Sequence, residues 1–216
     1  MTIHCAISYF EENSGGYLLG CDSTLQRVRT NGSSIEVVDS ISVDKSFRGA
    51  CSLGFVRGAG RPKTSEPLGT QFAAAMRSLD FRFDSIRPGE VYNDLPSLLQ
   101  EYVLLIAKQQ AERLELFTVS NQRKKKEHNH RARLLHQLEQ TTLSAERASV
   151  VFYAPCTPHY FQMKFEERCG FVRAKKILEQ LLTERSVINT NPQQPIYDPG
   201  KASLFAVDFT GIRQIA

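Results

Sequence analysis

Residues 121–133 carry far more positive charge than folding alone requires. The segment reads NQRKKKEHNHRAR, in which six residues are Lys or Arg, two are His and one is Glu. Leucines at 134, 135 and 138 follow with helical spacing, which predicts a helix over 131–140 whose first turns reach back toward residue 121. Cations at a helix start oppose the helix dipole, so we expect this segment to meet an anion such as a nucleic-acid backbone.

A second basic stretch lies between residues 48 and 63, where arginines alternate with glycines that let a backbone approach phosphate closely. The alternative for both stretches is a solvated basic surface or a flexible loop. The residues predicted to bind DNA or RNA are Arg123, Lys124, Lys125, Lys126, His128, His130, Arg131, Arg133, Arg57, Arg61 and Lys63.

The composition is that of an ordinary globular protein. The chain has 216 residues, 41% of them hydrophobic, and a formal net charge of +4. No run of eighteen apolar residues and no secretory signal are visible, so we expect a cytoplasmic protein without a membrane partner. The five cysteines form no CxxC pair, which favours reduced thiols over a zinc site.

Apolar periodicity and turn residues divide the chain into elements. Strands are predicted over 2–10, 17–22, 34–43, 50–56, 149–154 and 203–209, and helices over 70–79, 95–116, 131–140 and 171–184, with 115–120 open to either. This mixture predicts an α/β or α+β fold, in which a mixed sheet is opened by an N-terminal β-hairpin and flanked by amphipathic helices. We expect a single domain, 1–216, with an internal division near 60–70 between a β-rich part (1–60) and a helical and α/β part (70–216) left open.

Several short stretches in the last 90 residues could belong to a nuclease. They are His128-Asn129 with LLHQL at 134–138, VVFYAP at 150–155, FQMKFEE at 161–167, SVI at 186–188 and IYDPG at 196–200. In these stretches the chain resembles bacterial restriction-endonuclease-like proteins associated with defence against phage.

That resemblance implies a metal-dependent nuclease, active or degenerate. Such folds hold a divalent metal such as Mg²⁺ on an Asp at a strand end, with Gln or Glu followed two residues later by Lys. Here Asp22 would be the catalytic Asp and metal ligand, and Gln122 and Lys124 would complete the set. About 100 residues separate Asp22 from Gln122, more than this family usually shows. A strand end at Gln122 would also move the helix start toward Glu127.

The first 24 residues suggest another chemistry. Thr2 follows Met1, and GYLLGCDS at 16–23 reads as a strand that ends in Asp22. In this the chain resembles proteasome-type N-terminal nucleophile hydrolases, in which a Thr exposed by loss of Met attacks with its own α-amine as base. The resemblance implies catalytic roles for Thr2 and Asp22. The lysine that the family carries about sixteen residues after the Asp is missing, because Val38 stands there.

A third hypothesis involves no catalysis. The chain would then be a subunit of a larger assembly, and the basic segment would dock on an acidic protein surface. Tyr and Phe side chains at 152, 153, 160, 161 and 165 could contribute to such an interface, although core packing explains them better.

Overall fold

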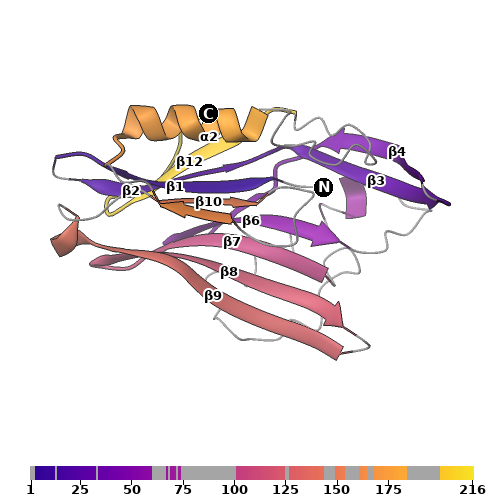
Figure 1. Ribbon diagram of the computed structural model, residues 1–216, viewed down its shortest axis with the longest axis horizontal. Helices are drawn as coiled ribbons and strands as arrows, with labels where there is room; N and C mark the ends of the chain where they lie inside the picture. Colours follow the sequence, from indigo (N-terminus) through magenta and orange to yellow (C-terminus); the bar gives the residue numbers. More distant parts are fainter. Residues whose placement is uncertain are drawn as a thin grey trace.

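The computed structural model describes residues 3–12, 14–32, 34–59, 67, 69–71, 73, 101–124, 127–143, 149–153, 161–164, 168–183 and 200–216. Most of the helix predicted over 70–79, the first residues of the one predicted over 95–116 and the end of the basic stretch at 48–63 lie outside this part of the chain. Within it, the structure consists mainly of antiparallel strands (Figure 1).

The described strands are numbered in the order in which they occur along the chain. They are β1 (His4–Phe10), β2 (Gly15–Cys21), β3 (Thr24–Asn31), β4 (Ser34–Ser42), β5 (Ser46–Arg48), β6 (Ser52–Ala59), β7 (Glu101–Gln109), β8 (Arg113–Lys124), β9 (Glu127–Glu139), β10 (Ser149–Tyr153), β11 (Phe161–Lys164), β12 (Ser203–Asp208) and β13 (Gly211–Gln214). A 3-10 turn, η3 (Gln140–Thr142), follows β9, and helix α2 spans Phe171–Thr183.

These strands form three antiparallel sheets. One has six strands in the order β11-β10-β1-β2-β12-β13, one has five in the order β5-β6-β7-β8-β9, and β3 pairs with β4 in a two-stranded ribbon. The prediction of an α/β or α+β fold with flanking helices is therefore wrong, because the protein is mostly β. The predicted N-terminal hairpin is confirmed, with Ile7 opposite Leu18 in β1 and β2.

The helix predicted over 95–116 is wrong where the structure describes it. Residues 101–109 form β7 and 113–124 form β8. Leu105, Ile106 and Ala107 are all buried in β7, so this strand lies inside the protein on both faces. A strand covered on both faces shows a continuous apolar run, which spacing alone cannot distinguish from a buried helix.

The helix predicted over 131–140 is also wrong, because these residues belong mainly to β9. The pairing of β8 with β9 shifts register at Leu116/Phe117: His136 faces Leu116 and Leu134 faces Phe117, so Leu135 is the extra residue of a bulge. On either side of this bulge, Leu138 is buried and Leu134 is 54% exposed. The bulge explains why the leucines have a spacing that resembles a helix.

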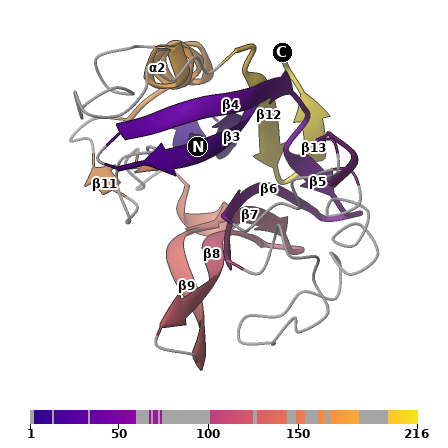
Figure 2. The same cartoon turned by 90° about the vertical axis from the view of Figure 1, so that its right-hand side faces the viewer.

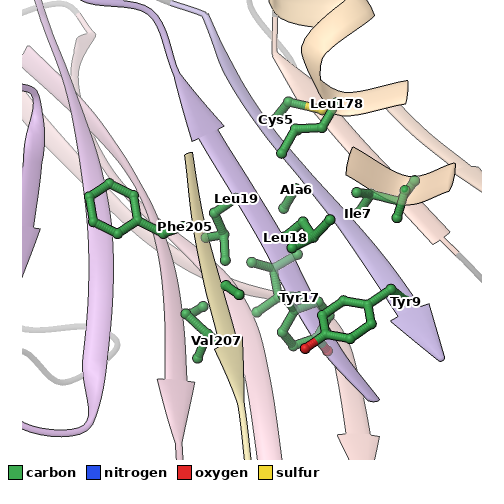
Figure 3. Packing of buried hydrophobic residues seen from close by; sticks show 14 of the residues in the cluster. Cys5, Ala6, Ile7, Tyr9, Tyr17, Leu18, Leu19, Leu178, Phe205 and Val207 are labelled. Atoms are coloured by element: carbon green, nitrogen blue, oxygen red, sulfur yellow. The ribbon is translucent and has the colours of Figure 1, made fainter. Parts of the chain in front are cut away.

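The core lies between the two large sheets and between the six-stranded sheet and α2. Figure 1 shows α2 across one face of that sheet, with the five-stranded sheet on the other. Phe55 of β6 and Phe205 of β12 meet between the sheets, with ring centroids 5.9 Å apart. On the helical side, Leu178 of α2 points toward Cys5 of β1 (Figure 3).

Helix α2 itself confirms the prediction over 171–184. Its buried residues, Ala174, Leu178 and Leu182, recur every four residues and form the stripe that packs on the sheet. In the described part of the chain, no helix is long and apolar enough to cross a membrane.

Candidate functional site

A buried ion pair joins Asp22 to Lys45 where the six-stranded sheet gives way to the β3–β4 ribbon. Lys45 Nζ lies 2.7 Å from Asp22 Oδ2, and both side chains are 0% exposed. The Lys45 ammonium also donates to the backbone carbonyl of Thr24. Buried charges are costly unless they are paired and hydrogen-bonded, so this arrangement is a specific feature of the fold and not a surface contact.

The Asp22 carboxylate also binds the first described residue of the chain. Its Oδ1 accepts a hydrogen bond of 2.6 Å from the backbone N–H of Ile3, and its Oδ2 accepts one of 3.1 Å from the N–H of Thr24. The Ile3 N–H belongs to the peptide bond that follows Thr2. Asp22 therefore couples the start of β1 to the Lys45 ammonium through its two oxygens.

Strand ends place these groups together. Ile3 precedes β1 and Asp22 follows β2, and the two strands pair with His4 opposite Cys21. Lys45 precedes β5, where its carbonyl accepts from the N–H of Val56. Figure 1 shows that β1 begins on the side of the molecule from which the β3–β4 ribbon projects, and Figure 2 shows the ribbon viewed from that side.

Cys21 lies beside the pair, and its chemistry differs from that of a reactive thiol. Burial, and secondarily the negative charge of Asp22, raises the pKa of the Cys21 thiol well above its ordinary value. A thiol with a raised pKa stays protonated at neutral pH and is a poor nucleophile. We therefore do not assign Cys21 a role as an attacking group.

Lys45 is the residue that the sequence analysis missed. It lies 23 residues after Asp22, where a lysine was sought near Val38. The ribbon accounts for the extra length, because β3 leads away and β4 returns, with Thr24 paired to Ser42. Lys45 is the only lysine in the first 60 residues, so a search by residue type in place of spacing would have found it.

Asp22 fits the predicted Mg²⁺ site poorly. Its oxygens face the Lys45 ammonium and two backbone N–H groups, all hydrogen-bond donors that a metal ion would have to displace. Among the described residues, no three His, Cys, Asp or Glu side chains gather as a metal site would require. Gln122 and Lys124 lie on β8 of the five-stranded sheet, whereas Asp22 follows β2 of the six-stranded sheet.

Of the basic segment, residues 121–124 lie in β8 and residues 127–133 in β9, and Lys124 is opposite Glu127 in the register of the two strands. The helix-dipole argument for an anion at this segment no longer applies, while nucleic-acid binding itself stays a prediction. Of the residues predicted for it, Arg57 lies in β6, Arg123 and Lys124 in β8, and His128, His130, Arg131 and Arg133 in β9, while Arg61, Lys63, Lys125 and Lys126 lie outside the described residues.

A pocket of about 320 Å³ lies at the opposite end of the β1–β2 hairpin, between Tyr9, Phe171 and Arg213. Its charged groups bind one another: Asp208 accepts from the Tyr9 hydroxyl at 3.1 Å and lies 3.1 Å from Arg213 Nη1. Glu11 accepts from the backbone N–H of Phe171 at 2.7 Å. Tyr9, Asp208, Arg213 and Glu11 thus have partners within the protein, and we assign no ligand to this pocket.

Comparison with family models, with curated proteins and with solved structures finds no match to this chain.

Proposed function

We propose that the protein is an N-terminal nucleophile hydrolase that cleaves peptide-type amide bonds with Thr2. The observation that carries this proposal is the Asp22–Lys45 pair, whose carboxylate also binds the N–H of Ile3, the residue next to Thr2. The N-terminal resemblance requires an Asp at the end of the second strand and a lysine, and Lys45 supplies the lysine that spacing alone did not find.

The chemistry assigns each group a separate task. Once Met1 is removed, the Thr2 hydroxyl oxygen attacks the carbonyl carbon of the substrate, and its proton passes to the Thr2 α-amine. The C–N bond breaks, the departing amine takes that proton, and the acyl group remains on Thr2 as an ester. Water then attacks the ester, which releases a carboxylic acid and restores the hydroxyl.

Lys45 and Asp22 act on this chemistry through charge and position. A fixed positive charge favours the negative charge that develops on the attacking oxygen. Asp22 holds the Lys45 side chain in place by direct pairing, and it anchors the start of β1 through Ile3. Both effects depend on burial, since water would screen an exposed ammonium.

The first test uses protein produced with Thr2 as its first residue, released by cleavage of a fusion partner and verified by intact mass. We expect it to hydrolyse a mixed peptide library and to be acylated at Thr2 by an electrophilic peptide probe, as located by mass spectrometry. Thr2→Ala should lower hydrolysis by about a thousandfold or more, and Thr2→Ser should keep part of it.

Thr183→Ala is the matched control, because the exposed Thr183 hydroxyl donates to the Glu179 carbonyl within α2. It should hydrolyse at the wild-type rate. Wild-type protein with a free Thr2 that neither cleaves peptides nor takes the label would refute the proposal, and so would full activity in Thr2→Ala.

A further inference from the structure

We infer that Gly200 is a positioning residue for the Asp22–Lys45 pair. The inference rests on the proposed function, and it adds a residue from the distant end of the chain. Gly200 lies just before β12, in which Ser203 pairs with Cys21 at the end of β2. This pairing brings Gly200 against the bend, residues 22–24, that carries Asp22.

Gly200 has no room for a side chain at this contact. A Cβ on Gly200 would lie 2.7 Å from Ser23 Oγ and 2.9 Å from Thr24 Oγ1, closer than real Cβ contacts come. Its φ of +66° is also a conformation that residues other than glycine rarely adopt. Both neighbours are short and more than nine-tenths buried, so rotation of their side chains offers little relief.

Thr24 transmits this contact to the ion pair. Its backbone N–H donates to Asp22 Oδ2, while its carbonyl accepts from the Lys45 ammonium. A shift of the Thr24 backbone therefore moves a donor to the carboxylate and an acceptor for the ammonium together. The close approach of Gly200 thus holds both charged groups in their present geometry.

Ser23 provides an internal way to relieve the contact. Its hydroxyl is buried and forms no hydrogen bond within the part of the chain that the structure describes. Ser23→Ala therefore removes the atom closest to the Cβ position of Gly200 without breaking a hydrogen bond among the described residues. In a Gly200→Ala background, it should restore part of what the extra methyl group disturbs.

The test compares Gly200→Ala with Gly32→Ala. Gly32 has nearly the same φ, +60°, but none of the described residues has an atom within 4 Å of the position of its Cβ. Both variants therefore carry similar backbone strain, and only Gly200→Ala introduces the clash. The readouts are kcat and KM for peptide hydrolysis and, independently, the NMR cross-peak that correlates Lys45 ¹³Cε with ¹⁵Nζ.

We expect Gly200→Ala to lower kcat by about tenfold to a hundredfold with little change in KM, and to shift the Lys45 cross-peak. Gly32→Ala should leave kcat and the Lys45 cross-peak at their wild-type values. The double variant Ser23→Ala/Gly200→Ala should recover part of the lost kcat and part of the shift of the cross-peak. A folded Gly200→Ala protein with an unshifted Lys45 cross-peak would overturn the inference, whether or not the wild-type protein hydrolyses peptides. A wild-type protein without activity would refute the proposed function alone, since the cross-peak still reports the position of Lys45.

If Gly200→Ala does not fold, the double variant Ser23→Ala/Gly200→Ala tests whether the contact with Ser23 is the cause. Recovery of folding with a near-normal Lys45 cross-peak supports the contact between Gly200 and Ser23. Failure of both variants to fold, beside a folded Gly32→Ala, would show that the fold as a whole needs Gly200, and would overturn its assignment as a positioning residue.

Discussion

Asp22 bridges Ile3 and Lys45: its Oδ1 lies 2.6 Å from the Ile3 backbone nitrogen, and its Oδ2 lies 2.7 Å from Lys45 Nζ. The two contacts join residues that are 42 positions apart in the chain through one carboxylate. Neither side chain reaches solvent, so each is a buried group whose direct partner is the other.

The first prediction concerns the loss of that pairing. Lys45→Met should destabilise the protein by about 3–5 kcal/mol, because it leaves the Asp22 carboxylate buried without its cation. It should also abolish the peptide hydrolysis proposed above. Urea unfolding at pH 7 measures the first effect and a peptide assay the second.

The control for Lys45→Met is a lysine in a surface pair. Lys175 lies 3.7 Å from Glu179 on α2, and both side chains are partly exposed. Lys175→Met should change the free energy of unfolding by less than about 1 kcal/mol. Equal stability of the Lys45→Met and Lys175→Met proteins would contradict the structural role of the buried pair.

The second prediction concerns pH and Asp208. Burial alone would raise the pKa of the Asp208 carboxyl, but hydrogen bonds from Thr210 and Tyr9 and the charge of Arg213 outweigh it and lower the pKa. A lowered pKa in the folded state means that ionised Asp208 stabilises the protein above its ordinary pKa of 3.8, and that this contribution is lost as the pH falls through the folded value.

Asp208→Asn should therefore be less stable than wild type at pH 7, by about 1–3 kcal/mol. The difference should narrow in urea unfolding curves as the pH is taken below 3.8. Tyr9→Phe removes one of the donors to Asp208, so it should weaken this acid dependence in part. If the difference in unfolding free energy between Asp208→Asn and wild type stays constant from pH 7 to acid, the lowered pKa of Asp208 is contradicted.

The third prediction tests the packing of α2 on the six-stranded sheet. A Cβ on Gly20 would lie 2.4 Å from Leu182 Cδ1 and 2.9 Å from Leu204 Cδ2. Gly20→Ala should destabilise the protein by about 1–3 kcal/mol, because a close-packed interior has no space for the added methyl group. Thermal unfolding followed by circular dichroism measures the loss.

Gly69 is a suitable control for Gly20, because among the described residues a Cβ there would meet only Ile41 Cδ1, at the ordinary contact distance of 3.4 Å. Gly69→Ala should therefore unfold near the wild-type temperature. If Gly20→Ala also does so, α2 does not pack against β2 in solution as it does in the structure.

The fourth prediction tests the basic hairpin separately from the candidate site. If residues 121–133 bind nucleic acid, wild-type protein should bind duplex DNA more weakly as salt rises. Changing Lys124, Lys125 and Lys126 together to Gln should reduce the slope of log K against log salt by about 2–3. Fluorescence anisotropy against salt concentration measures this slope.

The same triple variant should cleave peptides at the wild-type rate, since β8 and β9 lie outside the group formed by Ile3, Asp22 and Lys45. Binding that is absent in the wild type, or that does not respond to salt, would remove the nucleic-acid hypothesis. It would leave the hydrolase proposal unaffected.

Several elements were predicted correctly because their residues carry the signal locally. The turn residues at 11–14, followed by two glycines, mark a hairpin. The β-branched and aromatic run at 149–153 marks a strand, and the stripe of Ala174, Leu178 and Leu182 marks a helix. β7 and β9 were mistaken for helices because burial on both faces of one, and a bulge in the other, changed the spacing of their apolar residues.

The sequence by itself determined the residue types available for the candidate site: an Asp at the end of the second strand, a Thr next to Met1, and one lysine in the first 60 residues. Only the tertiary structure decided that Lys45 pairs with Asp22. It also decided that Gly200 packs against Ser23 and Thr24, the residues that follow Asp22. The physical reason is that an antiparallel ribbon returns the chain to its starting point whatever the length of the ribbon. Distance along the sequence therefore says little about which charges are buried together.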